Sequence, residues 1–218
     1  MTMEAYNNPY FSEVVNGADI VTPDGRPLSL FLKIFRGIEQ NRVCGMDIFP
    51  EILREAASRK KSVFFYGNTQ DVLDKILSRA NADFPSLAIA GTHSPPFRIL
   101  SPLEKDDIIT KIRKAEADLI FVSLGCPRQE NWMAEHKGKF RGCMLGLGQA
   151  FNVFARVESR SPRWMQEYAL DWLYRMYLNP RRLWKRYILT NSQFIYLTLR
   201  HSISGKQKAP SAKESAGS

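Results

Sequence analysis

Residues 118–133 read Asp-Leu-Ile-Phe-Val-Ser-Leu-Gly-Cys-Pro-Arg-Gln-Glu-Asn-Trp-Met. The apolar run over residues 119–124 ends at Gly125, and Pro127 stands where the first turn of a helix would begin. This order predicts a strand, a tight loop and a helix. In an α/β sheet such a corner lies at the carboxyl end of a strand, where backbone N–H groups and the positive end of the helix dipole favour an anionic ligand.

The first turn of this predicted helix contains Gln129 and Glu130. Their side chains could contact a sugar or a base while the backbone near Gly125 binds phosphate. Glu130 could equally be a favourable charge at the start of a helix, and the Gly-x-Pro sequence could be only a tight strand-to-helix connection. The residues alone leave both interpretations open.

The same order of strand and helix recurs along the first three quarters of the chain. Strands are expected over residues 18–21, 62–66, 87–91, 118–124 and 142–147, and helices over residues 70–80, 104–115 and 128–136. Thr69 is a suitable N-cap for the first of these helices. Strands that alternate with helices predict an α/β fold with a Rossmann-like, doubly wound, mainly parallel sheet, which we assign to residues 1–158.

The pattern changes in the C-terminal quarter. Apolar positions over residues 162–201 follow helical spacing, with one break at Asn179-Pro180, which predicts two helices. We therefore expect a helical appendage over residues 159–203. Residues 204–218 are mostly Lys, Ser, Ala and Gly, and we expect a disordered tail there.

The net charge of +9 is concentrated in the same part of the chain. Residues 160–213 contain eleven basic residues against two acidic ones, so this segment accounts for the whole excess. Its aromatic residues are interleaved with the cations, which suits the headgroup layer of an anionic membrane. Alternatively, the aromatic residues pack the helices onto the α/β domain and the arginines form a solvated face. A nucleic-acid partner is not expected, since no recognised nucleic-acid-binding motif is present.

Cysteine and histidine usage argues against a metal centre or a disulfide framework. The three cysteines and three histidines are widely separated and have no metal-ligand spacing. We interpret His93 and His136 as surface residues. The first residues lack the basic and apolar regions of a signal peptide, and no apolar run is long enough to span a membrane. We therefore expect a cytoplasmic protein, associated peripherally with the inner face of the cell membrane.

Eight segments of the chain resemble, in order, the WecG/TagA/CpsF family of bacterial glycosyltransferases (glycosyltransferase family 26). They cover residues 18–25, 42–47, 67–68, 125–132, 146–152, 161–164, 170–175 and 179–182. Two positions depart from the family pattern, because Asn152 stands where Asp is common and Arg156 replaces a glycine. The chain also begins roughly where an N-terminal motif of the family should end, so the sequence looks truncated there.

The resemblance implies an inverting transfer of a hexose, an N-acetylhexosamine or its uronate. The donor would be a UDP-sugar, and the acceptor a polyprenyl-diphosphate-linked saccharide of exopolysaccharide, capsule or teichoic-acid synthesis. No cofactor is implied. The sequence has no Asp-x-Asp pair to hold a divalent cation, so helix N-termini after Gly67 and Gly125, with arginines of the C-terminal segment, would stabilise the leaving diphosphate. A metal held by scattered carboxylates is the alternative.

Asp24 is our candidate for the general base. It matches the family's Asp-Gly motif, and a carboxylate at a loop tip suits removal of a proton from an acceptor hydroxyl. Without the resemblance, Pro23-Asp24-Gly25 would be an ordinary turn.

The remaining candidates are expected to bind substrate. Residues 42–47 could form a loop that closes over the site, although an Arg42–Asp47 pair holding that loop explains them nearly as well. Gly146 and Gly148 are expected to bring the backbone close to the nucleotide. The full set of expected substrate-binding residues is Arg42, Gly45, Asp47, Gly67, Asn68, Gly125, Pro127, Gln129, Glu130, Gly146, Gly148, Gln149, Asn152, Arg175, Arg181 and Arg182.

A basic, non-catalytic Rossmann-like module that binds membrane or nucleic acid stays open as the alternative function. It would use the same concentration of positive charge without any sugar transfer. A dinucleotide-dependent enzyme has no support, because no Gly-x-Gly-x-x-Gly sequence follows a predicted strand.

Overall fold

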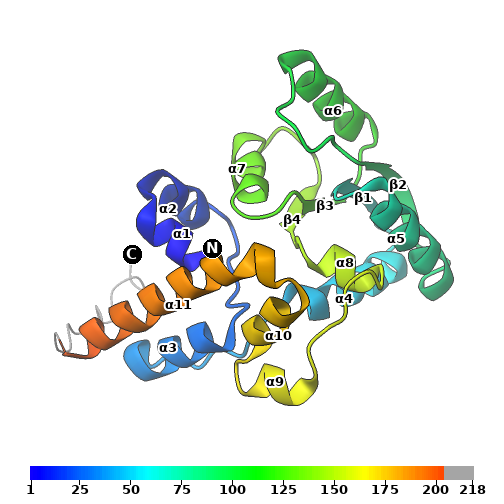
Figure 1. Ribbon diagram of the computed structural model, residues 1–218. Coiled ribbons are helices and arrows are strands. Elements are labelled where there is room, and N and C mark those ends of the chain that lie inside the picture. The colour runs from blue at the N-terminus through cyan, green and yellow to red at the C-terminus, as the bar shows by residue number, and fades with distance from the viewer. Residues whose placement is uncertain (204–218) are drawn as a thin grey trace, which may run out of the picture. The chain divides into compact units, whose positions relative to one another are not determined.

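The computed structural model describes residues 1–203, except the side chains of residues 182, 186 and 201–203. The expected tail over residues 204–218 lies outside the described residues. The chain divides into two compact units, the first formed by Met1–Thr22 and Val43–Arg160, the second by Pro23–Arg42 and the chain from Ser161 onward (Figure 1). Residues 23–42, which the sequence analysis assigned to the Rossmann-like domain, are thus grouped with the C-terminal helices.

A four-stranded parallel sheet forms the centre of the first unit. Its strands are β1 (Ser62–Gly67), β2 (Ala88–His93), β3 (Leu119–Ser123) and β4 (Cys143–Gly146), arranged in the order β2-β1-β3-β4. β1 and β3 are central, and their apolar runs are almost wholly buried, as parallel strands covered on both faces require. The predicted α/β fold with a parallel sheet is confirmed.

Helices cover both faces of this sheet (Figure 1). Val63, Phe65 and Phe121 point to one face, where they pack with α4 (Gly45–Ser58), α5 (Gln70–Asp83) and α8 (Ala150–Phe154). Phe64 and Tyr66 point to the other face, toward α6 (Pro102–Lys114) and α7 (Arg128–Glu135). The two-residue period of the strands therefore divides the core into two layers.

Two short helices begin the chain, α1 (Thr2–Asn7) and α2 (Pro9–Asn16). Asn8 caps α2, and the buried Phe11 anchors it. The predicted strand over residues 18–21 is wrong, because this segment pairs with no strand and Ile20 is 83% exposed. Instead, Lys137 holds the segment by an ion pair with Asp19 at 2.7 Å.

In the described residues of the second unit, all the regular elements are helices. It contains α3 (Arg26–Arg36), α9 (Arg163–Glu167), α10 (Asp171–Leu178) and α11 (Pro180–Ile203). The predicted break at Asn179-Pro180 is confirmed, but the segment before it forms two helices instead of one. Ala169 has a left-handed backbone (φ 61°), which ends α9 before α10 begins.

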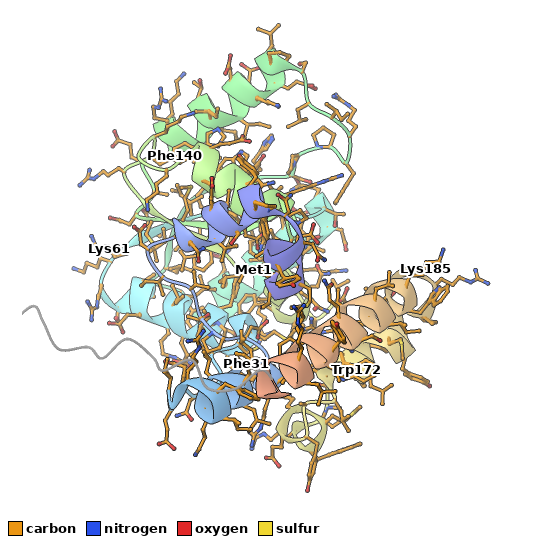
Figure 2. The ribbon with its side chains drawn as sticks, turned by 90° about the vertical axis from the view of Figure 1, so that its left-hand side faces the viewer. Met1, Phe31, Lys61, Phe140, Trp172 and Lys185 are labelled. Atoms are coloured by element: carbon orange, nitrogen blue, oxygen red, sulfur yellow. The ribbon has the colours of Figure 1, made fainter. Side chains whose placement is uncertain are left out.

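Aromatic contacts connect the helices of the second unit. The rings of Phe31 and Phe194 lie 6.2 Å apart between α3 and α11, and those of Trp172 and Tyr187 lie 6.1 Å apart between α10 and α11. Lys185 extends outward from α11 (Figure 2). Within residues 1–203, no helix combines the length and the apolar character that crossing a bilayer requires.

Candidate active site

The sheet has a topological switch point between β1 and β3. The chain passes from β1 to β2 on one side, and then returns to β3 on the other side of β1. In open α/β sheets, ligands bind in the crevice outside the carboxyl ends of the strands at such a point. At this edge of the sheet the chain leaves β1 at Asn68 and β3 at Leu124. The turn over residues 125–127, on which the prediction of a strand-loop-helix corner was based, comes directly after Leu124.

Gly67 lets the ends of β1 and β3 approach each other closely. Its φ is +106°, and a Cβ atom at this position would overlap the backbone oxygen of Ser123. The backbone N–H of Asn68 donates to that same oxygen at 2.9 Å. Only glycine fits this contact, so the sequence Gly67-Asn68 sets the spacing of the two strand ends.

Two helices begin beside the switch point. α5 starts after Thr69, whose hydroxyl accepts a hydrogen bond from the backbone N–H of Val72, as predicted for its N-cap. α7 starts at Arg128, one residue after Pro127, and the turn before it depends on Gly125 with a φ of +79°. The N-termini of α5 and α7 therefore supply the backbone N–H groups that an anionic ligand requires.

Gln129 is the most buried polar member of the predicted site, with 6% of its surface exposed. Its Nε2 donates to Glu130 Oε1 at 3.0 Å. Gln129 Oε1 and Glu130 Oε2 are buried, and neither has a hydrogen-bond partner in the described part of the chain. Buried acceptor atoms normally accept a hydrogen bond, so both oxygens are suited to accept one from a ligand hydroxyl or amide.

Gly146 and Gly148 make room for this glutamine. A Cβ atom on Gly148 would lie 3.2 Å from Gln129 Oε1, and one on Gly146 would lie 3.3 Å from Gln129 Nε2. A Cβ atom on Gly146 would also lie 2.8 Å from Met133 Cε. The approach of both glycines to a nucleotide stays a prediction.

Three side chains join the ends of β1, β3 and β4. Asn68 Nδ2 donates to Asn152 Oδ1 at 2.7 Å and to Ser123 Oγ at 3.3 Å, and Ser123 Oγ donates to the backbone oxygen of Gly148 at 2.9 Å. Gln149 and Asn152 both come from the start of α8 and both donate to Glu158. The sequence analysis missed Glu158 and Ser123; the spacing of Gln149, Asn152 and Glu158 was the available signal for Glu158.

Gly45 and Asp47 lie in the first turn of α4, so residues 42–47 are not one loop. Asp47 forms a two-pronged ion pair with Arg160, in which Nη2 and Oδ2 are 2.8 Å apart. Arg42 instead pairs with Asp171. The described ion pairs thus give Arg42 and Asp47 different partners, and a pair between the two stays a prediction.

The other candidates belong to the second unit. Asp24 lies in the exposed turn before α3, and Arg42 Nε donates to its backbone oxygen at 2.7 Å. Arg42 Nη1 lies 3.0 Å from Asp171 Oδ2, and this pair is largely buried, with side chains 16% and 23% exposed. Arg175 is half-buried in the last turn of α10, and Arg181 is exposed at the start of α11, while the side chain of Arg182 lies outside the described residues.

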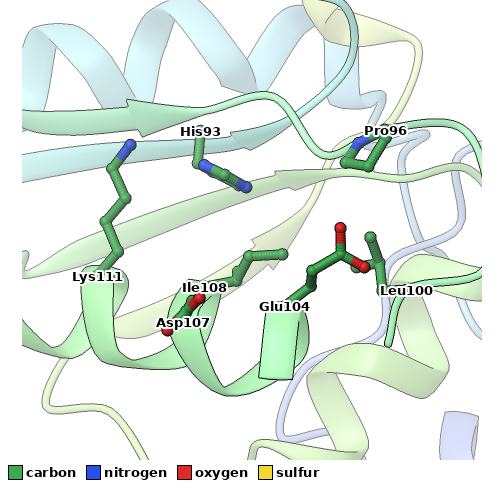
Figure 3. Close-up of a pocket in the computed structure, with 7 residues that line it drawn as sticks. All are labelled: His93, Pro96, Leu100, Glu104, Asp107, Ile108 and Lys111. Carbon is green, nitrogen blue, oxygen red and sulfur yellow. The ribbon is translucent and has the colours of Figure 1, made fainter. Parts of the chain in front are cut away.

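A cleft of about 250 Å³ opens where β2 ends, beside α6 (Figure 3). His93 points into it, and its Nε2 is buried without a partner in the described residues. Burial and the nearby Lys111 lower the pKa of His93. Arg98 and the Ser101 cap bind Glu104, which lowers its pKa to about 2. The cleft is lined by His93, Pro96, Leu100, Glu104, Asp107, Ile108 and Lys111.

The interpretation of His136 as a surface residue is wrong, because its side chain is 7% exposed and its ring stacks on Trp132 and Phe140. His93 is half-buried and lines the cleft. No disulfide joins the three cysteines. Among the described residues, no three His, Cys, Asp or Glu side chains are grouped as a metal site.

Comparison with known proteins gives a consistent result. The model of the glycosyl transferase WecG/TagA/CpsF family matches residues 1–208. A protein of Bacillus spizizenii is 32% identical over 199 residues, which cover 91% of this chain and 75% of the relative. A Bacillus subtilis protein is 33% identical over 178 residues, covering 81% and 67%, and a Staphylococcus aureus protein is 27% identical over 180 residues, covering 81% and 66%.

All three relatives are named N-acetylglucosaminyldiphosphoundecaprenol N-acetyl-beta-D-mannosaminyltransferase. The family match spans both units of the chain and includes every segment on which the resemblance was based. The chain therefore belongs to the WecG/TagA/CpsF family of glycosyl transferases, and it is a glycosyltransferase.

Proposed function

We propose that this protein moves a sugar from a UDP-sugar to a polyprenyl-diphosphate-linked saccharide, with inversion at the anomeric carbon, in the synthesis of a bacterial cell-envelope polysaccharide or teichoic acid. The observation that carries the proposal is the switch point, where α5 and α7 begin and where the first turn of α7 holds the buried, unpartnered oxygens of Gln129 and Glu130. The family membership supplies the reaction class.

The donor diphosphate binds at the ends of β1 and β3. Backbone N–H groups at the starts of α5 and α7 stabilise its charge. Gln129 and Glu130 present unpaired oxygens that accept hydrogen bonds from sugar hydroxyl or amide groups. N-acetylmannosamine is the first donor sugar to test, because the relatives are named for its transfer. Their names also make an N-acetylglucosaminyl-diphosphate lipid the first acceptor.

The reaction is a single displacement at the anomeric carbon. Asp24 takes the proton of the acceptor hydroxyl as that oxygen attacks, and the bond to the diphosphate breaks with UDP as the leaving group. No Asp-x-Asp pair is present, so N–H groups and arginines such as Arg175 and Arg181 stabilise the leaving charge without a metal ion. Arg182 belongs to the same proposed set.

A lipid-linked acceptor places the enzyme on the inner face of the cell membrane. The helices over residues 159–203 form the proposed contact with an anionic surface. Trp184 and Tyr177 are exposed among the cations of this segment, and Lys185 Nζ lies 5.5 Å from the ring centre of Trp184. Exposed aromatic residues beside cations suit the headgroup layer. Nucleic acid is not a proposed partner.

The test is a donor screen that measures UDP release. The purified chain is incubated with UDP-glucose, UDP-N-acetylmannosamine or UDP-N-acetylmannosaminuronic acid, with and without a polyprenyl-diphosphate-N-acetylglucosamine. We expect acceptor-dependent release with one of these donors. Release from none, while the chain still binds anionic vesicles or nucleic acid, would favour the non-catalytic basic module.

A further inference from the structure

Glu158 has a role that neither the motifs nor the family match assigns. Both of its carboxylate oxygens accept a hydrogen bond from a side-chain amide. Asn152 Nδ2 donates to Oε1 at 2.9 Å, and Gln149 Nε2 donates to Oε2 at 2.6 Å. All three side chains are half-buried. Such charge-assisted hydrogen bonds are stronger than bonds between neutral groups.

The local fold brings Glu158 back over the start of α8. Gln149 and Asn152 are three residues apart, so they share one face of that helical turn. After α8 the backbone reverses at Arg156, which has a φ of +56°. The N–H groups of Val157 and Glu158 both bond to the backbone oxygen of Asn152, at 2.9 and 3.2 Å. This turn holds the carboxylate opposite the two amides.

A carboxylate can only accept hydrogen bonds, so Glu158 determines which way each amide faces. Asn152 must turn its NH₂ group toward Glu158, which leaves its Oδ1 to accept from Asn68 at 2.7 Å. Asn68 then turns its own NH₂ group toward Asn152 and Ser123. Its Oδ1 accepts from the backbone N–H of Thr69 at 2.9 Å, at the start of α5.

We propose that Glu158 is a positioning residue, which fixes the amides of Asn152 and Asn68 and thereby the turn that receives the donor diphosphate. The effect reaches the site through Asn68, whose backbone connects β1 to α5 at the switch point. Glu158 itself touches no proposed substrate group. This inference rests on the proposed function for its kinetic test, and on the hydrogen-bond network for its structural test.

A double-mutant cycle tests which group donates and which accepts in each hydrogen bond of this network. Glu158→Gln places an NH₂ group opposite one of the two amide donors, so one hydrogen bond is lost. Asn152→Asp places two carboxylates face to face. When both changes are combined, the new aspartate accepts from Asn68 and from the NH₂ group of the new glutamine, while the oxygen of that glutamine accepts from Gln149. Every hydrogen bond then has a donor and an acceptor again.

The expected result is a raised KM for the UDP-sugar in each single variant, by about tenfold for loss of one charge-assisted hydrogen bond, with kcat changed much less. The double variant should recover most of this loss. Glu55→Gln is the control, since the Glu55 carboxylate forms an exposed ion pair with Arg59 at the end of α4, and its KM should stay at the wild-type value.

Two outcomes overturn the inference. One is a wild-type KM in Glu158→Gln, and the other is a double variant as impaired as the two single variants combined. A merely structural role predicts a lower melting temperature without recovery of KM in the double variant. If the wild-type protein releases UDP from no donor, the proposed function fails, and the side-chain NH₂ resonances of Asn68 decide the inference. The chemical shifts of these resonances must change in Glu158→Gln and return to the wild-type values in the double variant.

Discussion

Arg42 Nε donates a hydrogen bond to the backbone oxygen of Asp24, 18 residues earlier in the chain, at 2.7 Å. The contact uses the main chain of Asp24, so it fixes the turn before α3 while the carboxylate stays on the exposed side of that turn. The same guanidinium pairs with Asp171 at the start of α10. One arginine thus connects the proposed general base to the helices of the second unit.

Asp24→Asn removes the proposed base and keeps the size and shape of the side chain. Turnover should fall by roughly 10²- to 10⁴-fold, the usual contribution of a general base, while UDP affinity and the melting temperature stay at wild-type values. Initial rates of UDP release and calorimetric titration with UDP measure the two quantities. Near-normal turnover would remove Asp24 from the mechanism.

Arg42→Lys keeps the charge but loses the Nε donor and the planar fork. The turn at Asp24 should loosen, and turnover should fall by about tenfold, the equivalent of one hydrogen bond of roughly 1.4 kcal/mol. Lys33→Ala is the matched control, because its ion pair with Glu39 on the surface of the second unit is exposed and contributes little. Equal rates for both variants would contradict a role for the Arg42 contact.

Sugar transfer should persist in EDTA. Helix N-termini and arginines are fixed positive groups, so they stabilise the leaving diphosphate whether or not a divalent cation is available. The measurement compares UDP release in EDTA with release in added Mg²⁺ or Mn²⁺. Loss of activity in EDTA that either metal restores would refute the metal-independent mechanism.

Binding to vesicles that contain anionic lipid should depend on the start of α11. Each basic residue near the surface contributes about 1 kcal/mol, so changing Arg181, Arg182, Lys185 and Arg186 together to Glu should release the protein in a flotation assay at matched salt. The charge-matched control changes four exposed residues of the first unit, Lys105, Lys114, Lys139 and Arg141, to Glu. Equal release by both variants would mean that net charge alone drives binding.

Asp118 should contribute to stability at neutral pH and lose that contribution in acid. The backbone N–H of Ser62 donates to Asp118 at 2.9 Å, and this bond, together with Lys61, lowers the pKa of Asp118 from 3.8 to about 2. A carboxyl group whose pKa is lower in the folded state than in the unfolded state stabilises the fold at pH values above its unfolded pKa. This contribution is lost as the pH falls from about 4 to about 2.

The variant Asp118→Asn should therefore melt at a lower temperature than the wild type at pH 7, with the difference shrinking toward pH 2. Circular dichroism melts across this range measure it. Asp106→Asn, at an exposed aspartate of the first unit, is the control. A difference that stays constant down to pH 2 would show that the ionised form of Asp118 is not what stabilises the starts of β1 and β3.

The sequence by itself determined the parallel sheet and the corners at the carboxyl ends of its two central strands. Apolar runs that end in Gly67 and Gly125 indicated β1, β3 and the corners after them, because strand periodicity, glycine backbone freedom and helix capping act over a few neighbouring residues. The same local rules found the break at Asn179-Pro180. They failed for residues 18–21, because a strand forms only where another strand is available to pair with it.

Only the tertiary structure decided which side chains meet. Asn68 and Asn152 lie 84 residues apart in the chain, and Arg160 binds Asp47 from 113 residues away. Residues 23–42 join the C-terminal helices through Arg42, Asp171 and the ring contact of Phe31 with Phe194. No local pattern encodes these partners, because each contact depends on how whole elements pack.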